Sequence, residues 1–292
     1  MSKIEWCDET INPQGWGCYG PGGTPEKPQP CSYCYAKRMS RGPYVPKCEM
    51  CRQFLPHWHP EVLEKPLRWK KPRKIFWQSM GDLFHPFTPA VQIAEIIGRI
   101  VMHTPQHTHI FLSKNSSRYA EFNPWPDNCW LGTTVTCQED ADARIPELLK
   151  AQAKVLFVSA EPLLGSLNLR RYFQQPWICE FCFKTYYGDH LPGGWDFAWQ
   201  SAVCPDCYQK VEQDGGYSVV PGGKYASSPD PRPWQSPIHW LIIGAMTGPG
   251  AVKPPEGAVS SLIQQARASN VPLFLKDNLR RPFKIQEFPK CP

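Results

Sequence analysis

Long hydrophobic runs are missing from this chain of 292 residues. No apolar stretch reaches the roughly 18 residues that a membrane-spanning helix needs. The first residues, Met1–Trp6, also lack the apolar centre of a signal peptide. We therefore expect a cytoplasmic protein with no membrane partner.

A strong excess of either charge is missing as well. The chain has 32 Lys and Arg against 26 Asp and Glu, a formal net charge of +6. This balance permits an anionic partner without requiring one. The length is sufficient for one substantial core with insertions.

Cysteine, by contrast, is plentiful, with 13 residues. In a reducing cytoplasm, cysteines in this number favour metal ligation over disulfides. Four pairs have the two-residue interval that is typical of metal ligands: Cys31 and Cys34, Cys48 and Cys51, Cys179 and Cys182, and Cys204 and Cys207.

A Gly- and Pro-rich loop brings together Cys18, Cys31 and Cys34. Three thiolates can ligate three irons of a 4Fe-4S cluster, and the fourth iron then stays open for chemistry. Tyr33 comes directly before the last cysteine, and a short helix is expected to start just after it. The loop is therefore the first candidate site.

The loop is accompanied by other motifs: Ile4-Glu5-Trp6, Asn12-Pro13, Ser79-Met80-Gly81-Asp82-Leu83-Phe84-His85, Trp130-Leu131-Gly132 and Ala160-Glu161-Pro162-Leu163-Leu164-Gly165. In combination they resemble the radical S-adenosylmethionine superfamily, and within it the phage-associated three-cysteine-motif family, which is similar to spore photoproduct lyase. The twelve residues between Cys18 and Cys31 exceed the usual interval of three. A phage-encoded member would act in the host cytoplasm.

The resemblance implies an enzyme in which Cys18, Cys31 and Cys34 hold the cluster and the open iron binds S-adenosylmethionine, which is cleaved to a 5′-deoxyadenosyl radical. It also implies an electron donor such as flavodoxin or ferredoxin. The residues expected to contact the cofactor are Tyr33, Ser79, Gly81, Asp82 and Glu161. Asp82 can instead cap a turn, and Glu161 can instead bind substrate or be a buried acid satisfied by backbone amides.

Two segments depart from the family pattern. The chain has Val135-Thr136-Cys137 and Ala245-Met246-Thr247 where the family commonly carries a carboxylate. These differences leave the substrate and the retention of catalysis open. Cys137 is a candidate hydrogen-atom donor by analogy with spore photoproduct lyase, and an ordinary buried cysteine is the alternative.

The middle and end of the chain alternate strand and helix patterns, which predicts a parallel sheet. Strands are expected at 75–79, 109–112, 129–136, 155–159, 240–243 and 271–275, and helices after Thr88-Pro89, at 139–150 and at 256–270. The predicted fold is α/β, a partial TIM-like (β/α)6 barrel with an inserted zinc-ribbon-like segment. The expected divisions are 1–165 and 239–292 for the barrel and 166–238 for the insertion, with the site at the carboxyl ends of the strands.

Two further metal sites are predicted. Cys179, Cys182, Cys204 and Cys207 have nearly the spacing of a zinc ribbon, a closed structural site. Cys48 and Cys51, followed by His57 and His59, can form a small zinc site, can hold an auxiliary iron-sulfur cluster, or can bind no metal at all.

A basic segment, Lys65–Lys74, carries six Lys and Arg in ten residues and no acid, with Trp69 among them. This composition suits a phosphate backbone and a stacked base, so nucleic acid is a possible substrate, for base modification or lesion repair. A solvated strand entry is the alternative reading, with a protein or small-molecule substrate. The competing function is a non-catalytic, zinc-rich protein that binds nucleic acid or protein on a barrel scaffold.

Overall fold

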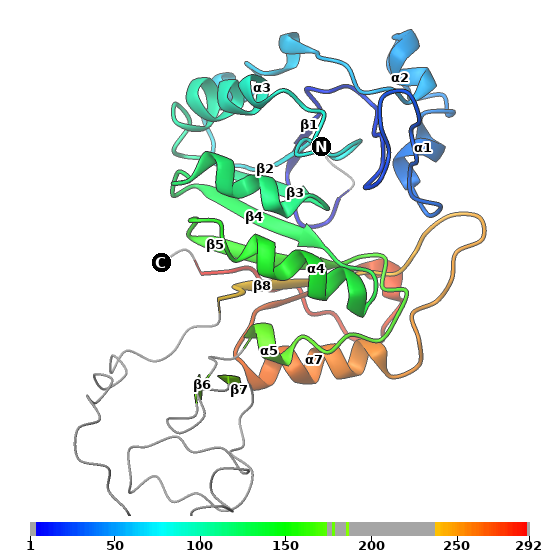
Figure 1. Ribbon diagram of the computed structural model, residues 1–292, viewed down its shortest axis with the longest axis vertical. Helices are drawn as coiled ribbons and strands as arrows, with labels where there is room; N and C mark the ends of the chain where they lie inside the picture. Colours follow the sequence, from blue (N-terminus) through cyan, green and yellow to red (C-terminus); the bar gives the residue numbers. More distant parts are fainter. Residues whose placement is uncertain (1–3, 174–176, 179–184, 187–236, 291–292) are drawn as a thin grey trace, which may run out of the picture.

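The computed structural model describes residues 4–173, 177–178, 185–186 and 237–290. Its centre is a seven-stranded, all-parallel sheet whose spatial order is β1-β2-β3-β4-β5-β8-β9, the order of the strands in the chain (Figure 1). The strands are β1 (Glu9–Ile11), β2 (Lys74–Trp77), β3 (Thr108–Ser113), β4 (Cys129–Thr134), β5 (Val155–Ala160), β8 (Trp240–Ile243) and β9 (Leu273–Leu275). Because β1 and β9 do not pair with each other, the sheet is an open half-barrel.

Helices connect successive strands. The main ones are α3 (Ala90–Glu95), η4 (Ser116–Phe122), α4 (Gln138–Leu148) and α7 (Ala258–Ala268). Helix α3 continues directly into the π-helical turns of η3 (Ile96–Val101). Shorter elements are α1 (Tyr35–Met39), α2 (Glu49–Gln53), η1 (Pro60–Val62), η2 (Pro66–Arg68), α5 (Arg170–Phe173) and η5 (Asp277–Leu279). The strands β6 (Trp177–Ile178) and β7 (Thr185–Tyr186) form a separate antiparallel pair.

Both faces of the sheet are buried, which explains why its central strands read as continuous apolar runs. On one face, Trp77, Leu131 and Val158 share a core with residues of α3, α4 and α7. On the other face, Phe76, Trp130, Phe157, Trp240 and Phe274 form a second core, which Trp6 joins from the first residues described. This second core fills the strands' inner side with aromatic rings.

The predicted α/β class and the parallel sheet are confirmed, and the half-barrel is compatible with the predicted partial barrel. The number of strands is larger than the six predicted, because Glu9–Ile11 also pairs in parallel with β2. The zinc-ribbon cysteines Cys179, Cys182, Cys204 and Cys207 lie outside the described residues, and the predicted divisions at 165 and 239 stay predictions. In the part of the chain that the structure describes, no helix is both long and apolar enough to cross a membrane.

Candidate metal centre and cysteine loop

The long connection between β1 and β2 carries both groups of candidate ligands. It contains the loop of Cys18, Cys31 and Cys34 and, further on, the pair Cys48 and Cys51. Figure 1 shows this connection, with α1 and α2, at one end of the sheet. The fold therefore brings two sulfur-rich sites into one region.

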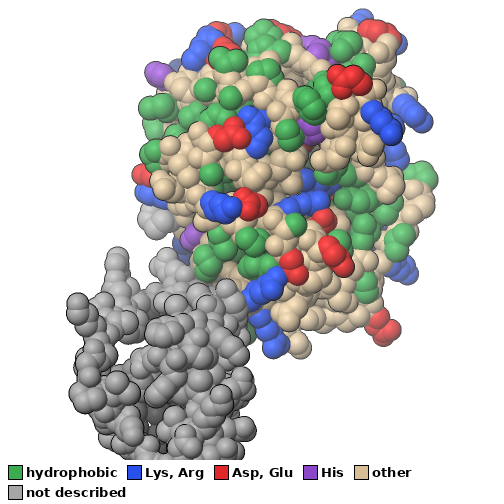
Figure 2. Space-filling model, viewed as in Figure 1, with side chains coloured by type: hydrophobic (Ala, Val, Ile, Leu, Met, Phe, Trp, Pro, Cys, Tyr) green, Lys and Arg blue, Asp and Glu red, His purple; other side chains and the backbone are tan. Residues whose placement is uncertain are grey.

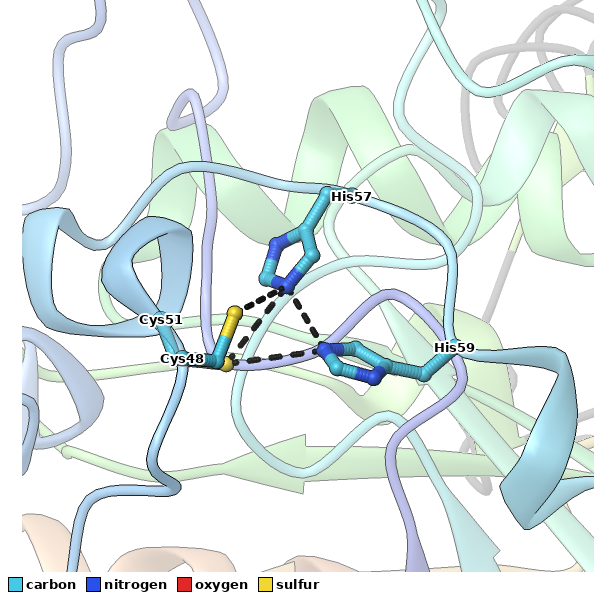
Figure 3. A group of neighbouring side chains, drawn as sticks. All are labelled: Cys48, Cys51, His57 and His59. Atoms are coloured by element: carbon cyan, nitrogen blue, oxygen red, sulfur yellow. Dashed lines mark hydrogen bonds between the residues drawn. The ribbon is translucent and has the colours of Figure 1, made fainter.

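Cys48, Cys51, His57 and His59 form one compact group, with their ligand atoms within 4.8 Å of one another. The Sγ of Cys48 lies 3.0 Å from Nε2 of His57, and the Sγ of Cys51 lies 3.7 Å from Nε2 of His57 and 3.8 Å from Nε2 of His59. The two Nε2 atoms lie 2.6 Å apart. Tetrahedral zinc, with bonds of about 2.0–2.3 Å, separates its ligand atoms by about 3.3–3.8 Å, so the two Cys51 distances match it and the two shorter distances require a small shift of the side chains. The group can therefore hold a metal ion, and Figure 3 shows the four side chains converging on one point.

Local structure explains the convergence. Cys48 precedes the first turn of α2, and Cys51 lies within the same short helix, so the two-residue interval puts both thiols at one end. Phe54, with φ 60°, ends α2 in the left-handed conformation and turns the chain back. His57 and His59 then approach the thiols from the returning segment (Figure 3).

Each imidazole is held by a second partner on its outer nitrogen. The Nδ1 of His57 lies 2.9 Å from the Leu55 carbonyl, and the Nδ1 of His59 lies 2.5 Å from the Glu61 carboxylate. Such contacts fix the tautomer that leaves Nε2 free for a metal. The Glu61 backbone N–H and the His59 ring lower the pKa of that carboxyl group, so Glu61 is ionised where it meets His59.

The three thiols of the cysteine loop each meet one donor. The Gly20 N–H lies 3.3 Å from the Sγ of Cys18, and the Lys37 N–H lies 3.4 Å from the Sγ of Cys34, which caps α1. The third thiol, Cys31, lies 3.1 Å from the ammonium of Lys114. All three cysteines are partly buried.

Burial, with a further contribution from Asp82, raises the pKa of the Cys18 thiol to about 12. The charges of Cys34 and Cys31 act in the same direction. Such a thiol keeps its proton near neutral pH unless a cation replaces it.

The loop lies over the carboxyl ends of the strands. The Gly17 N–H donates to the Met80 carbonyl just after β2, at 3.1 Å, and a side chain at Gly81 would lie only 2.2 Å from the Gly17 oxygen. From α1, the Tyr35 hydroxyl donates to the Ser79 carbonyl, and the Arg38 guanidinium donates to the Thr247 carbonyl after β8. The structure thus places Ser79 and Gly81 against the loop.

Asp82 is fully engaged within the protein. Its carboxylate accepts from the Phe84 N–H, the Ser113 hydroxyl, the Lys114 N–H and the Asn115 amide, at 2.6–3.1 Å. These bonds tie the end of β2 to the end of β3. The alternative turn-holding role of Asp82 therefore has a clear geometric basis, and a role in binding the cofactor stays a prediction.

Glu161 follows β5 at the rim of the sheet, which is the edge where the carboxyl ends of the strands lie. Its carboxylate is partly buried beside Gly244 and lies 2.5 Å from the ammonium of Lys276, which follows β9. Burial raises the pKa of Glu161, and Lys276 opposes that shift. The acid is paired with a lysine rather than satisfied by backbone amides alone.

Cys137 comes directly before α4, at the end of β4. A side chain at Gly165 would lie 3.5 Å from the Cβ of Cys137. The proposed hydrogen-donor role of Cys137 stays a prediction.

Lys114 is a site residue that the sequence analysis missed. It follows β3, and its ammonium contacts Cys31 and lies 4.8 Å from the centre of the Tyr33 ring. Burial lowers the pKa of Lys114, but the neighbouring Cys31 and Tyr33 raise it more, so the lysine is charged. Its position after a strand, on the rim, was the only signal in the sequence.

A cavity of about 110 Å³ is lined by one residue of each of the two sulfur groups, Cys18 and His57. Its lining also includes Asp82 and Trp58. Tyr19, His85 and Phe87 add an aromatic wall, with Tyr19 edge-on to both other rings. The cysteine loop and the metal centre therefore share the lining of one cavity.

Fold and site together define an α/β half-barrel protein with a group of side chains that can bind a metal. A family model described as "Protein of unknown function (DUF5131)" matches residues 1–280. The chain belongs to this family. Neither the search of curated proteins nor the search of solved structures returned a match.

Proposed function

We propose that the protein is a radical S-adenosylmethionine enzyme whose cluster is held by Cys18, Cys31 and Cys34. The observation that carries the proposal is the placement of three partly buried thiols from one loop over the carboxyl ends of parallel strands. Each thiol faces one hydrogen-bond donor, and such donors accompany cluster thiolates.

When bound, a cluster of this kind supplies the electron that cleaves S-adenosylmethionine to methionine and a 5′-deoxyadenosyl radical. The chain's own residues hold the site around it. Lys114 balances the thiolate charge at Cys31, and the Asp82 network keeps the ends of β2 and β3 together. The hydrogen bonds of Tyr35 and Arg38 to backbone carbonyls after β2 and β8 hold α1 against the rim.

The test is anaerobic reconstitution of the full chain with iron and sulfide. The unaltered protein is expected to be brown and to carry four irons per cluster, and Cys18→Ala, Cys31→Ala or Cys34→Ala is expected to lose iron and colour. Cys137→Ala, on the same rim, is the matched control and should keep both. An unchanged iron content in the variant that carries all three Cys→Ala substitutions would contradict the proposal.

For the metal centre we propose zinc. Two thiolates and two imidazoles that present Nε2, with outer partners on both rings, form a closed tetrahedral set without a position for substrate. The predicted ribbon cysteines would bind a second zinc. Metal analysis of Cys48→Ala and Cys204→Ala should each show the loss of one zinc equivalent with iron retained.

The metal centre also favours a second candidate function, a non-catalytic zinc-binding protein on a half-barrel scaffold. The same reconstitution separates the two. A protein that stays colourless while carrying zinc at Cys48, Cys51, His57 and His59 would support this second function.

An electron donor such as flavodoxin or ferredoxin is part of the proposed enzyme. We propose the surface of α1 and α2 for its docking, because this surface adjoins Cys34. Lys37, Arg38 and Arg52 lie in the two helices, beside the exposed apolar side chains of Met39 and Met50. Basic side chains gather at this edge of the molecule in Figure 2, which suits an acidic donor protein.

Nucleic acid is proposed as the substrate class, with the basic segment Lys65–Lys74 as the contact. Lys70 and Lys71 are exposed. Arg73 is committed to Glu9 and lies over the Trp69 ring, 4.8 Å from its centre. The segment leads into the amino end of β2, opposite the cysteine loop, so it would hold the backbone at a distance from the reacting nucleotide.

A further inference from the structure

The backbone that leads to Cys18 lies between two parts of the molecule. Residues 13–17 pass with the metal centre on one side and the end of β2 on the other. Contacts on both sides are made largely by the backbone of this segment, which is therefore called the bridging segment.

On the side of the metal centre, the contacts are close. The His59 N–H donates to the Pro13 carbonyl at 2.6 Å, and the His57 N–H donates to the Gln14 carbonyl at 3.3 Å. The Trp16 N–H lies 3.3 Å from the Sγ of Cys51. Three of the four ligand residues therefore bond the bridging segment directly.

Gly15 makes this approach possible. Its φ is +60°, and a Cβ there would lie 2.5 Å from the His57 ring, 3.0 Å from the His59 ring and 3.1 Å from the Sγ of Cys51. A residue with a side chain would be strained and would push into the ligand set. The bridging segment therefore packs closely against the metal centre.

On the other side, the bridging segment bonds the sheet. The Gln78 side chain accepts from the Gln14 N–H and donates to the Gly15 carbonyl, both at 2.9 Å. The Gly17 N–H donates to Met80, and the backbone of Leu55 and Pro56 leaves no room for a side chain at Gly17. Cys18 is the next residue.

We infer that the metal centre is a clamp that positions Cys18 for the cysteine loop. The inference rests on the zinc site proposed above. With the ion bound, the two thiolates and two imidazoles hold the segment Cys51–His59 against residues 13–17. Without it, the four crowded ligand groups have no ion between them, this segment loosens, and the Cys18 thiol leaves its partly buried position, because metal binding supplies the folding free energy of such small units.

The test measures the accessibility of Cys18 in the full chain isolated without iron, so that it does not depend on the cluster. Cys48→Ser removes a ligand that does not bond the bridging segment. We expect the loss of one zinc equivalent and at least a tenfold faster alkylation of Cys18, mapped by mass spectrometry. Cys48→His, which keeps a zinc ligand, should keep both the zinc and the slow alkylation, and the alkylation of Cys137 serves as the internal control.

Chelation of zinc from the unaltered protein, followed by its return, gives the same comparison if Cys48→Ser does not fold. Cys18 that is alkylated at the same slow rate with and without the ion would overturn the clamp, as would an unaltered protein with no metal at this group. A protein that passes this test but takes up no iron on reconstitution would contradict the proposed enzyme and leave the clamp in place.

Discussion

His109 is a buried, neutral residue of β3 whose two ring nitrogens each have a hydrogen-bond partner. The Trp77 indole N–H donates to its Nδ1 at 3.0 Å, so Nε2 carries the proton and donates to the Thr104 hydroxyl, also at 3.0 Å. That hydroxyl in turn donates to the Ile100 carbonyl. A second proton on His109 would face the indole N–H.

This arrangement predicts acid sensitivity. Burial, followed by the charge of His107, lowers the pKa of His109 to about 3 from 6.5. Below pH 6.5, His109 binds a proton in the unfolded chain but not in the folded chain, so the free energy of unfolding falls as the pH drops toward 3. The part due to His109 is about 2 kcal/mol between pH 7 and pH 5.

Urea unfolding at these two pH values checks the expectation. His109→Gln can make both hydrogen bonds without titrating, so its loss of stability should be smaller than that of the unaltered protein by this amount. The exposed His103→Gln is the control and should behave like the unaltered protein. Equal losses in all three would show that His109 does not carry the effect.

Lys114 gives a prediction that depends on the proposed cluster. Its charge, 3.1 Å from the Sγ of Cys31, stabilises the more negative, reduced form. The Lys114→Met variant should therefore keep its iron, and the midpoint potential of its cluster should be lower. Redox titration measures this potential. Lys37→Met, whose side chain is exposed beside the same loop, should not shift it, and an equal shift in both variants would contradict a direct effect.

At this scale the sequence predicted the four candidate ligands of a metal but not the residues that support them. The spacing of Cys48, Cys51, His57 and His59 is local, and the structure brings these four together. Gly15 and Lys114 reach their sites through tertiary contacts, and no motif marks them. Asp82 was placed correctly on the rim, while its four internal donors became visible only with the strand ends side by side.

Among the elements, β4 and β5 show how closely the sheet is packed on its inner side. Gly132 pairs in register with Phe157, and a Cβ on Gly132 would lie 2.3–2.5 Å from the Phe157 ring. The ring therefore occupies the space that a side chain at Gly132 would need. Trp240 continues the layer, 5.5 Å from Phe157 between ring centres.

Gly132→Ala should accordingly destabilise the protein by about 1–3 kcal/mol through overpacking. Gly98→Ala is the matched control, because no atom lies within 4 Å of a Cβ there and alanine favours the helix. Denaturant unfolding measures both. Combining Gly132→Ala with Phe157→Leu should recover part of the loss, and simple additivity of the two changes would argue against the contact as the cause.

The elements themselves were predicted well where the pattern is long and strongly apolar, as in β3 to β5. β1 was missed because Glu9–Ile11 has only three residues, two of them polar, and becomes a strand by pairing with β2. The π-helical turns of η3 were expected as ordinary helix, since hydrophobic spacing does not distinguish the two. Helix α4 is shorter than the predicted 139–150 at its end, where Leu149 caps it.

For the whole molecule, the basic segment yields a test of the substrate class. If nucleic acid binds there, Lys70→Ala with Lys71→Ala should weaken binding and reduce the slope of its salt dependence by up to about two units. Lys150→Ala with Lys154→Ala, in another part of the surface, is the control pair. Fluorescence anisotropy over a salt series is the measurement, and the absence of binding at low salt in the unaltered protein would rule out the proposal.

The strand order of the sheet bears on how the protein is made. Because β3, β4 and β5 each pair with the strand before them in the chain, this part of the sheet can grow on the ribosome one strand at a time, through contacts that are short in sequence. The growth then halts at β5, because residues 161–239 must be synthesised before Trp240–Ile243 can pair with Phe157–Ala160. At about 5–20 residues per second this delay lasts about 4–16 s. During it, the nascent chain carries a temporary edge at β5, open to pairing with neighbouring chains on the same messenger RNA.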